Sequence, residues 1–463
     1  MTAHGPETCD LMIRNAHVLT LDGGGTVHPS GAIAVRGSSI AAVGPDAAVA
    51  KAWRAARVID AQGAVAHPGF VEGHLHVNAT TCRGVFRGNT SKGSAGGPNY
   101  ADWKAALSAE DELAATLLSG IEMLRHGFTC FVEPGSAFEP DAVAEGAEAV
   151  GIRCTLADPY LWDDTTLMDI IAGLKSDTLF ARVPPTRERA MRLLGGQLRR
   201  NAAPDGIVHG HVALYGEGSA SDALLQAGKA AADAAGTVLN THIGFDVDLA
   251  EAMITHWKGS RFQHLEALGV LGPNVTFVHM NVIDDDDVAP LLRHRPTLVW
   301  CPLNYLRGIS LRRPTRLPEM IGLGVPVGLG TDSARQSTLG DCGFLALHLA
   351  AEIGQPITAE TVLTMLTMAS ARAGGLDRLI GSLEVGKRAD IVIRDPSLAE
   401  SQPGWDVPTQ LVAVGHGATA DTVLVNGRIV LRHGRSTRVD EGDVFRRARA
   451  SVAEVVRRIG LAA

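Results

Sequence analysis

The sequence predicts an α/β protein in which a (β/α)8 TIM-like barrel carries a small β-sandwich built from the N- and C-terminal segments. Two observations predict it. Both ends of the chain alternate short apolar runs with turn residues, which is typical of strands. The middle contains eight short apolar runs separated by longer helical stretches, which is typical of βα units. We therefore expect residues 1–66 and 383–463 to form the two parts of the sandwich, and residues 67–382 the barrel.

The N-terminal segment reads as short strands joined by turns. A turn is expected where Asp22 is followed by three glycines. The strands are expected at residues 11–21, 31–35, 40–43 and 57–59.

The barrel strands are the short apolar runs of the middle segment. We expect them at residues 70–71, 128–132, 152–156, 207–214, 237–240, 275–278, 297–300 and 325–329. Leucine and isoleucine recur at helical spacing over residues 112–125, and residues 186–200 and 359–372 show a similar period. The glycine-rich stretch 83–99 is interpreted as a lid over the first strand.

The C-terminal segment returns to the strand pattern and ends in a helix. Strands are expected at residues 389–393, 411–414 and 422–431, with Asn426 and Gly427 supplying a hairpin turn. A basic amphipathic helix is expected at residues 444–459. The simplest closure pairs the strands of the two ends.

The composition excludes several classes of protein. Of 463 residues, 46% are hydrophobic and 20% charged, and the net charge of −8 is spread along the chain, so we expect no nucleic-acid partner. The sequence shows neither a secretion signal nor an apolar stretch of about 18 residues, so we expect a cytoplasmic protein without a membrane partner. The six cysteines never form a CxxC pair, which argues against disulfides and thiolate metal sites.

Histidines and one aspartate stand at the predicted strand ends. The HxH pair His74 and His76 ends the first barrel strand, His242 follows the fifth, His279 ends the sixth and Asp332 follows the eighth. A second HxH occurs within residues 207–214, so the motif alone is weak evidence. Because barrel chemistry collects at the C-terminal ends of the strands, five metal-competent residues at that rim predict a metal site.

These motifs resemble those of the amidohydrolase superfamily, and most closely its branch of triazine chlorohydrolases and cyclic-amidine deaminases. The resemblance rests on residues 68–76, His242, His279, residues 330–332 and the return signature 386–392. Within that branch the sequence is also similar to hydrolases of phenylurea and molinate. The resemblance covers nearly the whole chain and implies a small-molecule substrate and a homo-oligomer.

The resemblance assigns roles residue by residue. It implies that His74, His76, His242 and Asp332 bind one divalent ion, and that Asp332 also transfers protons while His279 binds the substrate. Relatives with two metals bridge them by a lysine of strand four, and residues 207–215 contain none, so a mononuclear centre is expected. Zinc is the expected ion, although imidazole and carboxylate ligands also suit iron, manganese or cobalt.

One position departs from the deaminases of this branch. They carry a glutamate three residues after the strand-five histidine, which passes a proton to a ring nitrogen, and here that residue is Phe245. Asp246 or Glu217 would have to replace it. The departure favours hydrolysis of an amide, urea or (thio)carbamate C–N bond, such as that of a phenylurea.

Two alternatives stay open. One is an aminohydrolase or dechlorinase of a heteroaromatic ring, and the other is a noncatalytic scaffold of the same fold. The substrate is expected to meet further residues at or just past the strand ends. These candidates are His211, Phe245, Trp162, Trp300 and Asn304.

Overall fold

The computed structural model describes residues 5–86, 97–171, 176–308, 312–333, 335 and 337–461. The central part of the predicted lid, residues 87–96, lies outside the described residues. Within the described ranges, every helix is too short or too polar to cross a membrane.

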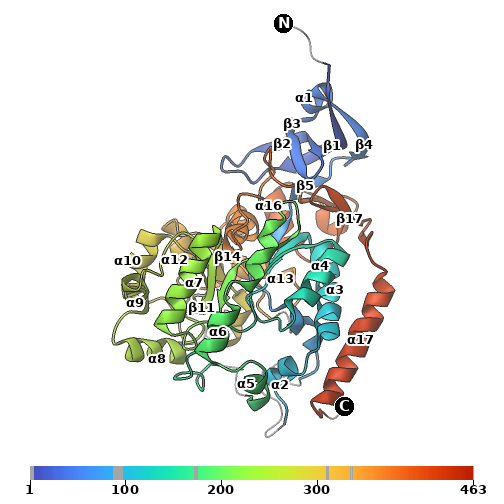
Figure 1. Ribbon diagram of the computed structural model, residues 1–463. Coiled ribbons are helices and arrows are strands. Elements are labelled where there is room, and N and C mark those ends of the chain that lie inside the picture. The colour runs from blue at the N-terminus through green and yellow to red at the C-terminus, as the bar shows by residue number, and fades with distance from the viewer. Residues whose placement is uncertain are drawn as a thin grey trace.

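Two parallel sheets form the middle of the chain (Figure 1). The first contains β6 (Phe70–Glu72), β7 (Phe128–Val132), β8 (Arg153–Leu156) and β9 (Val208–Gly210). The second contains β10 (Val212–Leu214), β11 (Leu239–Ile243), β12 (Val275–His279), β13 (Thr297–Trp300) and β14 (Val327–Leu329). All eight predicted runs form strands, and β7 and β13 have the predicted bounds.

The fourth predicted strand is split. The backbone N–H of His211 donates to Leu156 on β8, whereas that of the next residue, Val212, donates to Val238 beside β11. The chain changes its hydrogen-bonding partner at His211, so one apolar run supplies both β9 and β10.

The outer strands of the two sheets meet at their C-terminal ends. The N–H of Gly73 donates to Leu329 (2.8 Å), that of Asp332 to His74 (3.0 Å) and that of His76 to Asp332 (2.9 Å). A Cβ on Gly73 would lie 2.7 Å from the Leu329 carbonyl oxygen, so only glycine permits this approach. The arrangement is therefore barrel-like, and it brings the HxH segment against Asp332.

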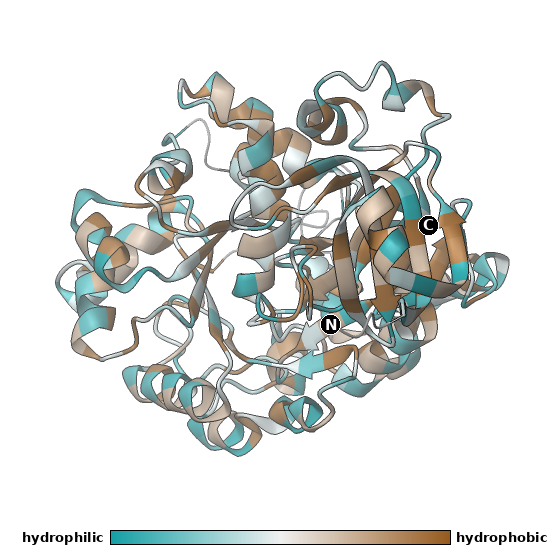
Figure 2. Ribbon diagram, turned by 90° about the horizontal axis from the view of Figure 1, so that it is seen from above, coloured by the Kyte–Doolittle hydropathy of each residue, from teal (hydrophilic) through white to brown (hydrophobic). Residues whose placement is uncertain are grey.

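Helices pack around the two sheets and beyond the ends of their strands (Figure 1). They are α2 (Tyr100–Ala105), α3 (Ala109–His126), α4 (Pro140–Val150), α5 (Asp177–Arg182), α6 (Arg187–Leu193), α7 (Asp222–Ala235), α8 (Val247–Trp257), α9 (Arg261–Ala267), α10 (Asp285–His294), α11 (Pro302–Gly308), α12 (Leu317–Gly322), α13 (Asp341–Glu352), α14 (Ala359–Thr364) and α15 (Ser370–Ala373). Figure 2 shows both colours alternating along the outer helices, as expected for helices with one buried face.

Two predicted helices are interrupted. The stretch 186–200 forms α6 and then, after the left-handed Gly195 (φ +84°), a 3₁₀ turn at Gly196–Ala202. The stretch 359–372 contains a π-helical turn, Met365–Ala369, between α14 and α15. Side-chain periodicity did not reveal either interruption.

Strands from both ends of the chain form one mixed sheet of nine strands. They are β1 (Glu7–Leu19), β2 (Val27–Arg36), β3 (Ser39–Pro45), β4 (Trp53–Asp60), β5 (Val65–Pro68), β15 (Ile391–Arg394), β16 (Ala420–Val425), β17 (Arg428–Arg432) and β18 (Arg435–Ser436), with α1 (Asp46–Ala52) between β3 and β4. Antiparallel pairing of β5 with β15 joins the ends. Buried residues of both ends, including Ile13 and Ile391, share one apolar core.

The strand predicted at residues 411–414 is wrong. This stretch lies in a π-helical turn, Gln410–Val414, that continues α16 (Val407–Thr409). Asp406 caps that helix by accepting from the N–H of Thr409, and a proline stands in its first turn. These start signals outweigh the apolar run.

The C-terminal helix α17 (Glu441–Arg458) runs along α3 (Figure 1). Ser451 donates to Asp111 (2.7 Å), and the Arg458 guanidinium donates to the same carboxylate (2.6 Å). The predicted helix is present, and it is bound to the first long helix of the barrel-like unit.

Candidate functional site

The structure brings the five predicted rim residues together. The ring centroid of His74 lies 4.9 Å from that of His76 and 4.8 Å from that of His242. One ligand atom from each of these three histidines lies within 4.8 Å of the others, and the same holds for His74, His279 and Asp332. His242 stands within β11, which runs past the predicted end of that strand.

The donor set fits a divalent cation. His74 is fully buried, and neither of its ring nitrogens has a hydrogen-bond partner. Burial lowers the pKa of His74 to about 4 and that of His242 to about 3, so both imidazoles are neutral at pH 7. Nδ1 of His242 faces the Tyr215 carbonyl oxygen, which assigns the proton to Nδ1 and leaves Nε2 free. A metal ion would give these buried nitrogens the partner they lack.

Asp332 connects the histidines to the side-chain amides of two asparagines. Its Oδ1 lies 3.3 Å from Nε2 of His76, and its Oδ2 accepts from Asn304 Nδ2 (3.2 Å). The side-chain Oδ1 of Asn304 accepts in turn from Asn281 Nδ2 (3.2 Å). Burial alone would raise the Asp332 pKa, but the neighbouring imidazoles of His74 and His76 hold it well below its usual value. The carboxylate is therefore charged and oriented.

Two site residues have left-handed backbone conformations. His279 has φ of +78° and Asp332 φ of +64°, a region that residues other than glycine seldom adopt. Such conformations persist where surrounding structure fixes them, and they concentrate at functional sites. Here they aim two strand-end side chains at the same point.

Phe245 lies beside the site, and neither carboxylate considered as a substitute is free. The Phe245 ring meets the His279 ring edge-on at 4.9 Å. Asp246 caps α8 by accepting from the N–H of Leu249 (2.8 Å). Glu217 is buried and accepts from Arg261 (3.0 Å) and from the backbone of the strand-five loop. Both carboxylates are thus held by hydrogen bonds within the chain.

The other predicted substrate residues differ in their contacts and in their position relative to the histidine cluster. Nδ1 of His211 lies 3.1 Å from the Thr155 hydroxyl, and its buried Nε2 has no partner. Trp162 is fully buried and donates to the Val183 carbonyl (2.8 Å). Its ring packs at 5.2 Å against Tyr215, which lies between it and His242.

Trp300 is also fully buried, within the main apolar core, and its indole N–H has no partner. Asn304 bonds directly to Asp332. Of the two tryptophans and the asparagine, only Asn304 contacts a predicted ligand residue.

Sequence reasoning missed three residues near the site. Asn281 follows strand six by two residues, a position that could have drawn attention to it. Tyr215 directly follows the fourth predicted strand, and its ring lies 5.3 Å from that of His242. Lys104 is 5% exposed on α2, and a lysine within an otherwise apolar run was the available signal.

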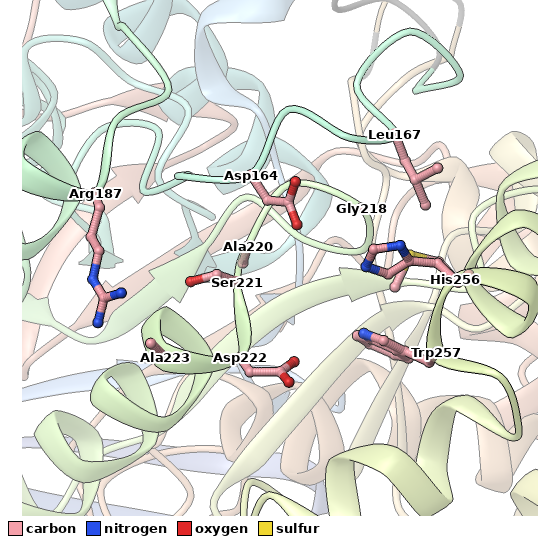
Figure 3. Close-up of a pocket in the computed structure, with 11 residues that line it drawn as sticks. Asp164, Leu167, Arg187, Gly218, Ala220, Ser221, Asp222, Ala223, His256 and Trp257 are labelled. Atoms are coloured by element: carbon pink, nitrogen blue, oxygen red, sulfur yellow. The ribbon is translucent and has the colours of Figure 1, made fainter.

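A separate cavity of about 300 Å³ lies between the loop that follows β10, the start of α7 and the end of α8 (Figure 3). Asp164, Arg187 and Asp222 line it, together with His256 and Trp257 at the end of α8. None of the five rim residues is among its lining residues, so it is distinct from the histidine cluster.

The chain is similar to a known protein family and to several known enzymes. The amidohydrolase family model matches residues 65–430. The chain is 30% identical to a 5-methylthioadenosine/S-adenosylhomocysteine deaminase of Symbiobacterium thermophilum over 464 residues, covering 96% of this chain and 99% of the relative. It is 28% identical to a 5'-deoxyadenosine deaminase of Methanosarcina acetivorans, covering 97% of this chain and 99% of the relative.

Solved structures share the fold. An adenosine deaminase from Xanthomonas campestris with bound zinc matches with a TM-score of 0.81 at 24% identity, covering 97% of this chain and 99% of that one. The zinc complex of an atrazine chlorohydrolase from Arthrobacter aurescens matches with a TM-score of 0.76 at 22% identity, covering 96% and 100%. These similarities give no support to the narrower resemblance to phenylurea and molinate hydrolases.

The family match spans most of the chain and includes the HxH segment, both later histidines and Asp332. The relatives that match over their full length are deaminases, which act on carbon–nitrogen bonds. The chain belongs to the amidohydrolase family, and it is a hydrolase that acts on carbon–nitrogen bonds.

Proposed function

We propose that this protein is a mononuclear, zinc-dependent aminohydrolase that releases ammonia from an amino-substituted nitrogen heterocycle. The unsatisfied histidine–aspartate cluster carries the proposal, because it supplies three neutral imidazoles and one carboxylate around one point. The names of the full-length relatives, which are deaminases of adenosine-type compounds, favour this substrate class over the amide and urea substrates expected from the sequence.

The residues of the site would have three roles: metal binding, proton transfer and hydrogen bonding to the substrate. His74, His76, His242 and Asp332 would hold the ion, which when bound lowers the pKa of a water ligand toward 7. Asp332 would accept a proton through the carboxylate that Asn304 orients, and would return it to the departing nitrogen. His279 would donate a hydrogen bond to the atom that gains negative charge.

Phe245 favours a second candidate, hydrolysis of a carbonyl C–N bond in an amide, urea or carbamate. A phenyl ring cannot give a proton to a ring nitrogen, and Asp246 and Glu217 are already hydrogen-bonded elsewhere. Attack on a carbonyl carbon needs no such proton. If the protein is an aminohydrolase, Asp332 must therefore supply the ring proton that a glutamate supplies in related deaminases.

Product analysis separates the two candidates. Purified enzyme would be incubated with aminopurines, aminopyrimidines, anilides and phenylureas, and ammonia, amines and carboxylates would be quantified. Ammonia with an intact ring supports the aminohydrolase, and an amine with a carboxylate or carbon dioxide supports the carbonyl hydrolase. Metal analysis should find about one transition-metal ion per chain, and active protein without any metal would overturn both.

A further inference from the structure

A buried lysine stands among tyrosine rings next to the histidine cluster. The Lys104 ammonium lies 5.0 Å from the ring centroid of Tyr100, 5.6 Å from that of Tyr160 and 5.9 Å from that of Tyr215. We call these four residues the Lys104 cluster. Asn99 caps α2 and fixes the helix that carries the lysine, since its side chain accepts from two N–H groups of the first turn.

The polar ends of this cluster are unsatisfied. Among the described residues, no carboxylate forms an ion pair with Lys104, and its ammonium donates no hydrogen bond. The stretches outside the description contain no Asp or Glu. The hydroxyl groups of Tyr100 and Tyr160 are buried without a partner as well. Two buried O–H donors without acceptors are costly unless an acceptor arrives with a ligand.

The cluster adjoins the metal site. Tyr215 belongs to both, because its ring lies 5.3 Å from that of His242 and its carbonyl oxygen faces the His242 Nδ1. A second cation, Arg335, lies 4.0 Å from the Tyr100 ring. The local charge beside the metal site is therefore positive.

We propose that the Lys104 cluster binds a carboxylate of the substrate, so that the enzyme acts on small organic acids whose scissile C–N bond is held at the histidine cluster. An ammonium and two phenolic hydroxyls match the acceptor-only oxygens of a carboxylate. The proposal rests on the proposed function for the reaction at the other end of the substrate.

The energetics favour a functional over a structural role for this lysine. Burial, followed by the charge of Arg335, lowers the pKa of Lys104 to about 7 against the opposing effect of Asp332. The folded protein therefore bears a cost for keeping the ammonium charged. A methionine of similar length would remove that cost, so Lys104→Met should raise the midpoint of thermal unfolding.

Binding of two matched probes tests the proposal without requiring turnover. Benzoate and its neutral isostere benzamide would be titrated calorimetrically into the metal-loaded enzyme. We expect the wild type to prefer benzoate. Lys104→Met should weaken benzoate binding about 10- to 100-fold and change benzamide binding less than about twofold. Tyr160→Phe keeps the ring and should weaken benzoate binding by a smaller factor.

Two controls make the result specific. Lys229→Met removes a partly buried lysine of α7 that pairs with Asp233, and it should change neither affinity. Metal content must stay unchanged in Lys104→Met. The proposal is overturned if the wild type shows no preference for benzoate, or if the preference persists in Lys104→Met because the metal binds the carboxylate. Failure to find turnover would contradict the proposed function alone, since these titrations measure binding.

Discussion

Two buried polar clusters adjoin each other at the rim of the barrel-like unit, and they differ in how far their groups are satisfied. In the Arg261 cluster, the guanidinium donates to Glu217 (3.0 Å), to Asp287 (2.9 Å) and to the Val282 carbonyl (2.9 Å). Within it, only Nε of Arg261 lacks a partner. In the histidine cluster, both nitrogens of His74 and Nδ1 of His279 lack one.

The difference separates the Arg261 cluster, which supports the fold, from the histidine cluster, which is left to bind a ligand. The Glu217 N–H donates to the His242 carbonyl (2.9 Å), so the satisfied cluster holds the strand that presents a ligand of the unsatisfied one. Charges that find partners within the chain stabilise a geometry, whereas polar groups left without partners indicate a missing ligand. Four predictions examine this division.

The largest effect is expected at the histidine cluster. Asp332→Asn and His242→Ala should each lower kcat/KM at least about 1,000-fold, because they remove a proton acceptor and an expected metal ligand. Asparagine suits the left-handed backbone at position 332 better than alanine does. Metal analysis should show loss of the ion in His242→Ala.

The matched control for this prediction comes from the second HxH. His209 lies 3.3 Å from Arg153 and outside the histidine cluster, so His209→Ala should keep the metal. Full activity in both Asp332→Asn and His242→Ala would remove the histidine cluster from the mechanism.

In the Arg261 cluster the effect should fall on stability. Arg261→Met leaves the buried Glu217 and Asp287 without their cation and should lower the free energy of unfolding by about 3–5 kcal/mol. Urea unfolding would measure it. The control Arg312→Ala breaks an exposed pair with Asp248 and should cost less than about 1 kcal/mol. Equal losses of unfolding free energy in the two variants would contradict the structural role assigned to Arg261.

A third variant adds a proton donor at the boundary of the site. Phe245→Glu places a carboxyl beside His279 and should increase ammonia release from an aminoheterocycle about 100-fold, the usual scale of general acid catalysis. Phe245→Gln has the same shape without the proton and should give no increase. Equal rates in the two variants would show that protonation at this position does not limit the reaction.

The smallest effect concerns a carboxylate satisfied by neutral donors. Glu133 accepts from Gly135, Ser136 and Ala137, but burial raises its pKa from 4.5 to about 7. The folded state then binds the proton more tightly than the unfolded state. The contribution is full below pH 4.5 and is lost as the pH rises to 7, with a slope of at most about 1.4 kcal/mol per pH unit. Denaturant titrations across this range should show a shallower slope for Glu133→Gln than for the wild type.

Much of the strand order was predictable from the sequence. Buried parallel strands read as short apolar runs, and β7 and β13 have the bounds expected from those runs. The positions of His74, His242 and Asp332 followed because strand ends converge on one rim. Their roles as ligands remain a prediction.

What the sequence did not reveal depends on contacts between distant segments. The break at His211 reflects a change of hydrogen-bonding partner from Leu156 to Val238, which no local pattern records. Lys104 lies on a short helix outside the strand ends, and only the folded chain brings it to Tyr160 and Tyr215. The turn at Gln410–Val414 continues a short capped helix, and its apolar residues resemble those of a strand.

The pairing of β5 with β15 also constrains how the protein is made. Pro68 pairs with Ile391, so a ribosome adds more than 300 residues between the two strands. At about 5–20 residues per second, this takes on the order of 15 to 60 seconds. During that interval the apolar faces of β1 and β5 lack their C-terminal partners, and the barrel-like segment must emerge before they are covered. The join between the chain ends is therefore among the last native contacts available during synthesis.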